Sequence, residues 1–257
     1  MRSIRGRLKM KKINVFLTAI ALVLTSGITF AQEEEEESKG YTYATYLYCD
    51  TNKESEMDKQ VAEFEVPIMD KLVEDGAMNS WGWMRHHTGG EWRRIRWFSV
   101  DSIEGAIEGI DAMGEAMDAA YEDSDVVASD ACPQHDDYIW QVQSTSDTDE
   151  RGPVGMSVYY SCKITDEARA DEIFEELFVP VLNQYVEDGK LTSWGWQSHV
   201  IGGWFRRLQT MTAPDYATLL ATRQEALDTI YADDSELGAE FVEICGPHHD
   251  YLWDNIH

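Results

Sequence analysis

The chain has 257 residues, of which 43% are hydrophobic and 11% aromatic, with 48 acidic and 21 basic residues. This apolar content is enough for one large or two ordinary domains, and it excludes a chain that is disordered throughout. The formal net charge of −27 argues against unaided binding to nucleic acid or to anionic membranes, because their phosphates would repel the protein.

The amino terminus has the pattern of an export signal. Six basic residues precede an apolar run over 13–30, and small residues up to Ala31 form a cleavage site. A transmembrane anchor is the alternative, but the run is short and polar residues interrupt it. We therefore predict a signal peptide over 1–31, an acidic tail over 32–40, and a secreted or periplasmic protein. Cleavage would leave 15 basic and 48 acidic residues, a net charge of −33.

The chain contains an internal duplication with a spacing of 113 positions. Residues 44–140 align with 157–253 without a gap and share 26 identities in 97 pairs, where composition alone would give about six. Ser-Trp-Gly-Trp occurs in both copies and is followed in each by a His, a Gly-Gly pair and an Arg-Arg pair. We predict two modules over 41–142 and 156–257, joined by a polar linker over 143–155.

Each copy shows the periodicities of a strand, a helix, two strands, a second helix and a last strand. In the first copy we predict strands over 41–49, 81–88, 91–99 and 135–142, and helices over 57–72 and 103–121. Thr51-Asn-Lys-Glu54 is typical of a capping box, and Pro67, like Pro180 in the second copy, predicts a kink or a two-piece helix. Tyr231 matches Tyr121 at a spacing of 110, which indicates a local shift.

This βαββαβ order resembles the ferredoxin-like modules of the dimeric α/β-barrel superfamily. The resemblance covers residues 41–142 and 156–255 and rests on element order and duplication. It implies an α+β fold in which two tandem modules of one chain form the barrel that separate subunits often form elsewhere. The superfamily includes cofactor-free monooxygenases, isomerases, haem-binding enzymes and stress-response proteins, so the fold selects no reaction.

Four cysteines, two per copy at matching positions, predict two disulfides in an exported protein. Three pairings are possible from the sequence alone. In the ferredoxin-like sheet that the resemblance implies, the first and last strands are antiparallel neighbours. This arrangement would join Cys49 to Cys132 and Cys162 to Cys245.

Each second cysteine is followed by a histidine and an aspartate. The Cys-x-x-His spacing at His135 and His248 is that of metal ligands, but a zinc site needs about four ligands and oxidation competes for the thiols, so we expect no metal. His135 with Asp137, and His248 with Asp250, lie on one strand face, where a carboxylate could orient the imidazole for acid–base chemistry. A structural pair beneath the disulfide is the interpretation we favour.

The Trp-Gly-Trp tracts also allow two interpretations. Tryptophans at every second position of a half-buried strand are ordinary core residues. Alternatively, Gly82 and Gly195 leave space beside the rings for a flat ligand. The Arg-Arg pairs point to opposite faces of their strand, so one arginine per copy faces a buried region and needs a carboxylate, an aromatic ring or an anionic ligand.

The hairpin register predicts a specific site. If Gly89-Gly90 is the turn, His86 pairs with Arg93, and by the repeat His199 pairs with Arg206. We expect the Trp-rich face to pack under the helices; its members are Trp81, Trp83, Arg85, Trp92, Arg94 and Phe98, with Trp194, Trp196, Phe205 and Met211 in the second copy. The His–Arg face would then look into the barrel, and its four side chains would bind an anionic or carbonyl-bearing ligand. A bulge would exchange the faces, and in the simplest alternative each Arg pairs with a carboxylate and no ligand binds there.

Together these features predict an exported protein that binds a small organic molecule without a cofactor. The enzyme alternatives are a cofactor-free oxygenase or isomerase and a haem enzyme with a His ligand; the third class is a structural or envelope-interaction protein. Because the two modules can bury their open sheet faces on each other, we also expect a monomer.

Overall fold

The computed structural model describes residues 40–122, 124, 130–148, 150–232 and 234–257. The predicted signal peptide and all but the last residue of the predicted acidic tail lie outside these ranges. Within the described ranges, no helix has both the length and the apolar character that crossing a bilayer requires.

The duplication appears as two modules whose shared elements follow the same order; the elements described in the second module also include a 3₁₀ turn and one further α-helix. The first module contains β1 (Tyr41–Tyr48), α1 (Glu54–Gln60), the π-helical η1 (Val61–Glu65), α2 (Val66–Glu74), β2 (Ser80–Gly89), β3 (Arg94–Val100), α3 (Ile103–Glu122) and β4 (Gln134–Thr145). The second module contains β5 (Val154–Tyr160), the 3₁₀ turn η2 (Ile164–Asp166), α4 (Glu167–Ile173), the π-helical η3 (Phe174–Phe178), α5 (Val179–Glu187), β6 (Ser193–Ile201), β7 (Arg207–Ala213), α6 (Tyr216–Ile230), α7 (Glu236–Cys245) and β8 (His248–Asn255). β4 continues into the predicted linker.

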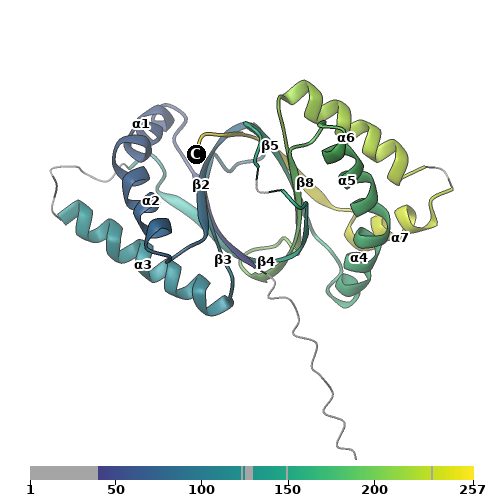
Figure 1. Cartoon of the computed structure of the whole chain (residues 1–257), viewed down its shortest axis with the longest axis horizontal. Helices are drawn as coiled ribbons and strands as arrows, with labels where there is room; N and C mark the ends of the chain where they lie inside the picture. The colour runs from purple at the N-terminus through teal and green to yellow at the C-terminus, as the bar shows by residue number, and fades with distance from the viewer. Residues whose placement is uncertain (1–39, 123, 125–129, 149, 233) are drawn as a thin grey trace, which may run out of the picture. The chain divides into compact units, whose positions relative to one another are not determined.

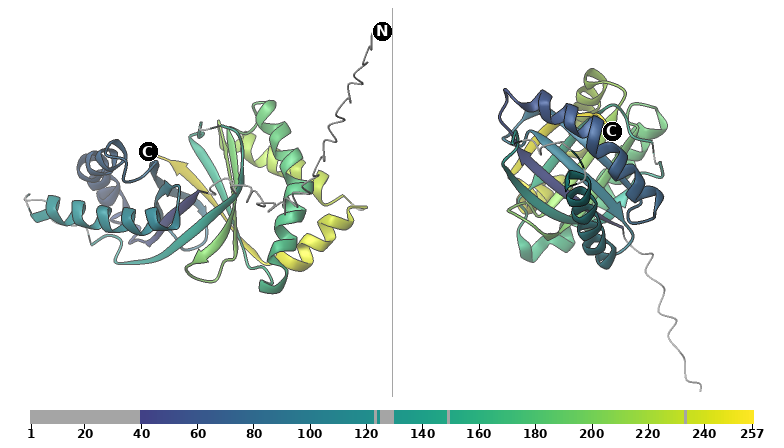
Figure 2. Two further views of the ribbon diagram at one scale, coloured as in Figure 1. Left: turned by 60° about the horizontal axis from the view of Figure 1, so that its bottom comes forward. Right: turned by 90° about the vertical axis from the view of Figure 1, so that its left-hand side faces the viewer.

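The strands form one closed barrel in the order β1-β3-β2-β8-β5-β7-β6-β4, and every neighbouring pair is antiparallel. The β2–β8 and β6–β4 pairs join the modules, so each module contributes four consecutive strands. The helices lie outside the barrel, with α1–α3 against the first module's strands and α4–α7 against the second module's (Figures 1 and 2). The predicted α+β fold, with both modules in one barrel, is confirmed.

The first helix begins differently from the prediction. α1 begins at Glu54 without a side-chain cap, so Thr51 and Glu54 do not form a capping box. Asp50 instead accepts hydrogen bonds from the backbone and the side chain of Asn52 and holds the preceding turn. The Glu54 carboxylate accepts a hydrogen bond from Arg93 of the hairpin, which explains why a glutamate stands there.

The predicted interruption of this helix is confirmed in both modules. Pro67 and Pro180 stand in the first turns of α2 and α5. A proline cannot donate the hydrogen bond to the carbonyl four residues earlier, and its ring crowds that carbonyl. The π-helical turns η1 and η3 directly precede the prolines and accommodate this break, so the chain continues as a helix on both sides.

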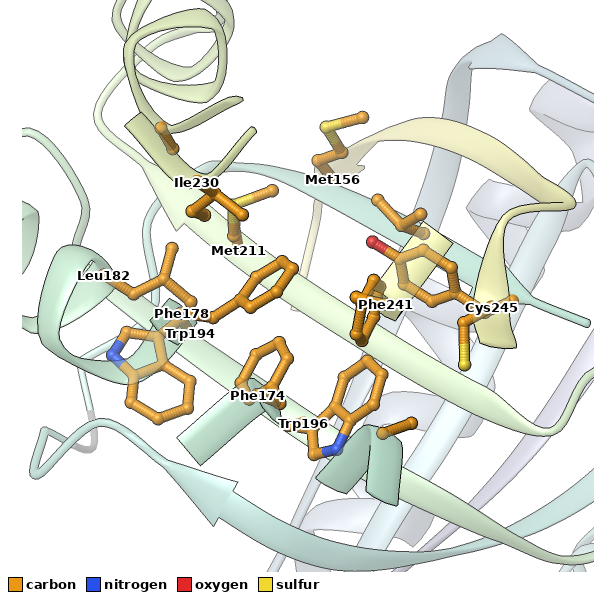
Figure 3. Packing of buried hydrophobic residues seen from close by; sticks show 14 of the residues in the cluster. Met156, Phe174, Phe178, Leu182, Trp194, Trp196, Met211, Ile230, Phe241 and Cys245 are labelled. Atoms are coloured by element: carbon orange, nitrogen blue, oxygen red, sulfur yellow. The ribbon is translucent and has the colours of Figure 1, made fainter. Parts of the chain in front are cut away.

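Two hydrophobic cores lie between the barrel and the helices. Trp81 and Trp83 pack beneath the first module's helices, and Trp194 and Trp196 beneath the second module's, as predicted. In Figure 3 the Trp196 ring lies against Phe174, and their centroids are 4.2 Å apart in nearly parallel planes. The space beside Gly82 is filled by Trp97, because a Cβ built there would lie 2.5 Å from that ring. The core interpretation of the Trp-Gly-Trp tract is therefore confirmed there.

A third core of aromatic side chains from both modules fills the barrel interior. Its buried aromatic members are Tyr46, Trp92, Trp97, Tyr138, Trp140, Tyr159, Tyr251 and Trp253. Trp92 was expected on the helix-facing side, as was Phe205, which packs against this interior core. Both predictions were wrong because β3 and β7 begin only after these residues, at Arg94 and Arg207, so strand alternation does not apply to them.

The Gly-Gly pairs hold the modules together. Gly89 has φ of +130°, and a Cβ there would lie 2.5 Å from the Asp250 carbonyl oxygen, while a Cβ on Gly90 would lie 2.2 Å from the Tyr251 hydroxyl. The Glu91 backbone N–H donates to that hydroxyl across 3.1 Å. In the second copy, Gly202 and Gly203 pack against Tyr138 in the same way. Each Gly-Gly pair therefore makes room for a tyrosine of the other module, beyond its expected role as a turn.

The four cysteines form the two disulfides Cys49–Cys132 and Cys162–Cys245, each with a sequence separation of 83. These are the pairs that the ferredoxin-like arrangement implied, because β1 and β4 are antiparallel neighbours and so are β5 and β8. Disulfide sulfurs are not available as zinc thiolates. The two bridges indicate an oxidising, non-cytoplasmic compartment.

Candidate functional site

The predicted His–Arg pairs are present, each with a glutamate. Arg93 donates from Nε to Glu54 Oε1 at 2.6 Å and from Nη1 to His86 Nδ1 at 2.7 Å. In the second module the corresponding distances from Arg206 to Glu167 and His199 are also 2.6 and 2.7 Å. Because arginine only donates, each histidine accepts through Nδ1 and is neutral.

The environment of these histidines favours the neutral form. Burial, followed by the adjacent Arg93 charge, lowers the pKa of His86, and the same causes act on His199 through Arg206. Burial tends to raise the pKa of Glu167, yet the hydrogen bond from Arg206 and the nearby arginine charges lower it overall. The result is a carboxylate, a guanidinium and a neutral imidazole in each module.

The structure does not bring the four predicted residues into one site. β2 and β6 lie four strands apart in the eight-stranded barrel, and the aromatic core lies between them. The His86 ring makes edge contacts with Tyr251 and Trp253 of the second module, and His199 contacts the equivalent tyrosine and tryptophan of the first. Arg93 and Arg206 pair with neighbouring carboxylates, which is the alternative stated for them above. These clusters stabilise the two seams between the modules, which are the β2–β8 and β4–β6 strand pairs.

The second arginine of each pair forms another repeated cluster. Arg94 is 1% exposed and donates to both oxygens of Asp58, at 2.6 and 2.7 Å, while Trp83 Nε1 donates to the same carboxylate at 3.1 Å. Arg207, Asp171 and Trp196 repeat this arrangement in the second module. The sequence showed that one arginine per copy would need an internal partner, but it did not identify that partner.

A cavity of about 900 Å³ lies outside the barrel in the second module. It is partly open to solvent and is lined by residues of β5, β8, α6 and α7 and by residues at the ends of these helices. The lining residues are Tyr160, Arg223, Leu227, Asp228, Tyr231, Ala232, Phe241, Val242, Cys245, Gly246, His248 and Asp250. A separate void of about 30 Å³ shares three of these residues and extends beneath α5. The first volume is within the range of small-molecule sites.

One wall of this cavity carries a histidine, a carboxylate and an arginine. Asp250 Oδ2 accepts from Arg223 Nη2 at 2.6 Å, and Asp250 Oδ1 lies 3.6 Å from His248 Nε2. His248 Nδ1 lies 2.8 Å from the Gly246 carbonyl oxygen, which only accepts, so Nδ1 carries the proton of the neutral ring. Nε2 is then a hydrogen-bond acceptor, and the atom nearest to it on Asp250, Oδ1, is also an acceptor. Asp250 Oδ1 is buried and has no hydrogen-bond donor among the described residues.

Aromatic side chains also line the cavity. Tyr160 is buried, its ring lies 5.6 Å from that of His248, and its hydroxyl donates to Gln209 Oε1 at 3.0 Å. Burial raises the pKa of Tyr160 well above its ordinary value and raises the pKa of Tyr231 to about 12. Both tyrosines are therefore neutral at ordinary pH, which leaves His248, Asp250 and Arg223 as the groups suited to proton transfer or anion binding.

The first module has a different set of residues at these positions. His135 Nε2 lies 3.2 Å from Asp137, but the other oxygen of that carboxylate accepts from the Tyr43 hydroxyl at 2.8 Å. The position of Tyr160 is occupied by Leu47 and that of Arg223 by Ile110, at the spacing of 113.

The spacing of 113 positions also holds in the second helix of each copy, α3 and α6. Their buried positions, Ala106, Gly109 and Met113 in α3 and Leu219, Thr222 and Ala226 in α6, remain 113 apart. The expected local shift to 110 is therefore not needed over these positions. Sequence identity between the copies pointed to His248 and Asp250. It could not point to Tyr160 and Arg223, because their counterparts are Leu47 and Ile110.

No family model matches the chain, and no curated protein matches it. Among solved structures, an anthrone oxidase-like protein matches with a TM-score of 0.53 and 11% identity, over 86% of this chain and 93% of that one. A candidate monooxygenase from Lactobacillus acidophilus NCFM matches at 0.53 and 6%, over 84% and 94%. A chlorite dismutase variant from Candidatus Nitrospira defluvii matches at 0.52 and 8%, over 84% and 92%. At these identities the likeness concerns architecture alone: the chain has the dimeric α/β-barrel fold.

Proposed function

We propose that this protein is an exported, monomeric small-molecule-binding protein, and that its ligand is an aromatic compound with an acidic hydroxyl group. The site is the cavity of the second module. The observation that carries the proposal is the meeting of two acceptors, His248 Nε2 and Asp250 Oδ1, in a cavity with aromatic walls. A hydroxyl proton between them would relieve their repulsion, and Tyr160, Tyr231 and Phe241 offer apolar surface to a ring.

The ligand class proposed is taken from the description of one structural neighbour, because the likeness itself concerns architecture alone. One neighbour is described as anthrone oxidase-like, and anthrones are tricyclic ketones with acidic protons. A tricyclic phenol is of the size that a cavity of about 900 Å³ accommodates. Arg223 adds a positive charge at the wall, which favours a carbonyl or phenolate oxygen. This retains the predicted ligand chemistry and places it away from His86 and His199.

The haem alternative fits these residues less well. His86 and His199 use Nδ1 to accept from arginine, and their rings are packed against aromatic side chains of the opposite module. His248 has a suitable hydrogen bond at Nδ1, but the Nε2 atom that iron would bind lies 3.6 Å from the Asp250 carboxylate. Iron would have to displace this contact.

Titration with alizarin, a dihydroxylated anthraquinone, tests the proposal. A chelator is added because this dye also binds free metal ions, and calorimetry reports the affinity. Leu227→Trp should fill the cavity and abolish binding, whereas Leu220→Trp, on the exposed side of the same helix, should leave it unchanged. Unchanged melting temperatures would show that both variants fold. Equal binding by the two variants, or none by the wild type, would refute the proposed site and ligand class. Sedimentation at moderate salt should report a monomer.

A further inference from the structure

Resting on the proposed function, we infer that His248 is a base that takes the ligand's hydroxyl proton, so that the ligand is held as its anion beside Arg223. The substrate class is phenols and enolisable ketones, whose O–H or adjacent C–H bonds are acidic enough for an imidazole. Binding would thereby activate the ligand toward electrophiles.

The hydrogen bond at Nδ1 makes His248 a directed base. Nδ1–H is held by the Gly246 carbonyl at 2.8 Å, so the only basic atom of the neutral ring is Nε2, at the cavity wall. Asp250 lies 3.6 Å from Nε2, and its negative charge stabilises the imidazolium that forms. The hydrogen bond to Gly246 thus fixes the tautomer and leaves Nε2 as the atom that accepts a proton.

The transfer balances without any further reactant. The O–H bond of the ligand breaks, an N–H bond forms at Nε2, and the electron pair remains on the ligand oxygen. Asp250 Oδ1, which has no donor beforehand, then faces a protonated nitrogen. Arg223 has five N–H donors, and one of them, on Nη2, is bonded to Asp250. The rest of this guanidinium carries the charge that holds the phenolate.

The other titratable groups around the cavity do not compete for this proton. Tyr160, on β5, donates its hydroxyl to Gln209 and so has no role as a base. Tyr231 is neutral, and Asp228, on the exposed side of α6, lies at the cavity's rim. The charged groups in contact with His248 are Asp250 and, bonded to Asp250, Arg223.

The first module provides an internal control for each residue. His135 and Asp137 repeat the base and its carboxylate, but Asp137 is bonded to Tyr43, and Ile110 stands where Arg223 stands. A variant of His135 or Asp137 thus makes the same chemical change at the same position of the fold, outside the cavity. Differences between matched variants report on the cavity and not on general stability.

The colour of bound alizarin tests the inference, because the phenol is yellow and its anion is red. At a pH well below the dye's own pKa, alizarin bound to the wild type should be red. His248→Gln should bind it in the yellow form, and Asp250→Asn should reduce the red fraction. His135→Gln and Asp137→Asn should behave as the wild type. Arg223→Met should weaken binding of the anion about tenfold, equivalent to about 1.4 kcal/mol.

The outcomes separate the two proposals. If alizarin binds the wild type in the cavity but stays yellow, the inference about His248 is wrong while the proposed function stands. If alizarin does not bind, the proposed function fails and the inference with it. A red complex that persists in His248→Gln would assign the proton transfer to another group and overturn the inference.

Discussion

The two modules have the same ion-pair clusters but different residues beneath their helices. Arg94 with Asp58 and Arg207 with Asp171 are equivalent in partner and distance. In contrast, the first module has the buried Glu65, which accepts from Arg96 and from Tyr121. At these positions the second module has Phe178, which packs in its hydrophobic core, and Gln209, which accepts from Tyr160.

This difference separates architecture from function inside one chain. A residue needed to form the barrel is needed twice, so both copies retain it. A residue needed for one ligand site is needed once, so the other copy is free to change. By this criterion the His–Arg–Glu and Arg–Asp–Trp clusters are structural. His248 and Asp250 have identical counterparts in His135 and Asp137, so Tyr160 and Arg223 are the residues that distinguish the cavity from the first module.

The largest expected effect tests the equivalence of the modules. Replacing Cys49 and Cys132 by alanine, or Cys162 and Cys245, should each cost about 4–5 kcal/mol, because both bridges close loops with the same separation of 83 residues. Urea unfolding of the two single-disulfide proteins measures this. Only loss of the second bridge should also weaken alizarin binding, because Cys245 lines the cavity. Clearly unequal losses would contradict the equivalence.

A second expected effect concerns the buried arginines. Arg94→Met and Arg207→Met should each destabilise the protein by about 3–5 kcal/mol, because a mostly buried carboxylate loses its partner. Arg93→Met is the control and should cost about 1 kcal/mol, since Arg93 is 25% exposed and solvent screens its pair. Chemical denaturation of the three variants gives the comparison. Equal losses at Arg93 and Arg94 would refute this ranking.

A smaller effect is expected at the seams between modules. Gly89→Ala and Gly202→Ala should each cost about 1–3 kcal/mol, because a side chain there meets both a positive φ and a tyrosine of the other module. Gly76→Ala separates the two causes, since Gly76 has φ of +80° but nothing within 4 Å of the added Cβ. The loss at Gly76 should be smaller in the same denaturation assay; an equal loss would mean that the tyrosine contacts contribute nothing.

Most of the fold could be predicted because duplication and periodicity both report on buried positions. The alternation at Trp81 and Trp83 gave the correct face, since both residues lie inside a regular strand. Trp92 was misplaced because it lies in the loop before β3, where the backbone sets the direction of each side chain individually. The capping box failed because Glu54 satisfies an arginine that is 39 residues away.

The site was harder to predict than the fold. Identities between the copies directed attention to His86 and His199, which prove to be part of the repeated structural clusters. The cavity depends on differences between the copies, on α7, and on the packing of α6 against β5. A comparison of where the copies differ in charge would have found Arg223 opposite Ile110, but only tertiary structure places it beside Asp250.

The smallest expected effect concerns how pH acts on the two seams. The pKa values of His86 and His199 are lowered in the folded protein by burial and by the adjacent arginines, so the unfolded chain binds these two protons more readily. The contribution of these two histidines to the free energy of unfolding is therefore fully present above the ordinary histidine pKa of about 6.5, and it declines as the pH falls below that value. Around His86 the charged groups are Arg93, Arg94 and Glu54, and Glu54 only partly offsets the arginines.

Melting temperatures measured from pH 7 downwards would test this effect in His86→Gln, His199→Gln and the double variant. Because the clusters are equivalent, each single substitution should remove about half of the decline that the histidines cause, and the double variant should remove all of it. His135→Gln, an exposed histidine of the first module, should leave the decline unchanged. A decline that persists in the double variant would assign the acid sensitivity to other groups. A decline removed by only one substitution would show that the two seams, despite matching distances, differ in strength.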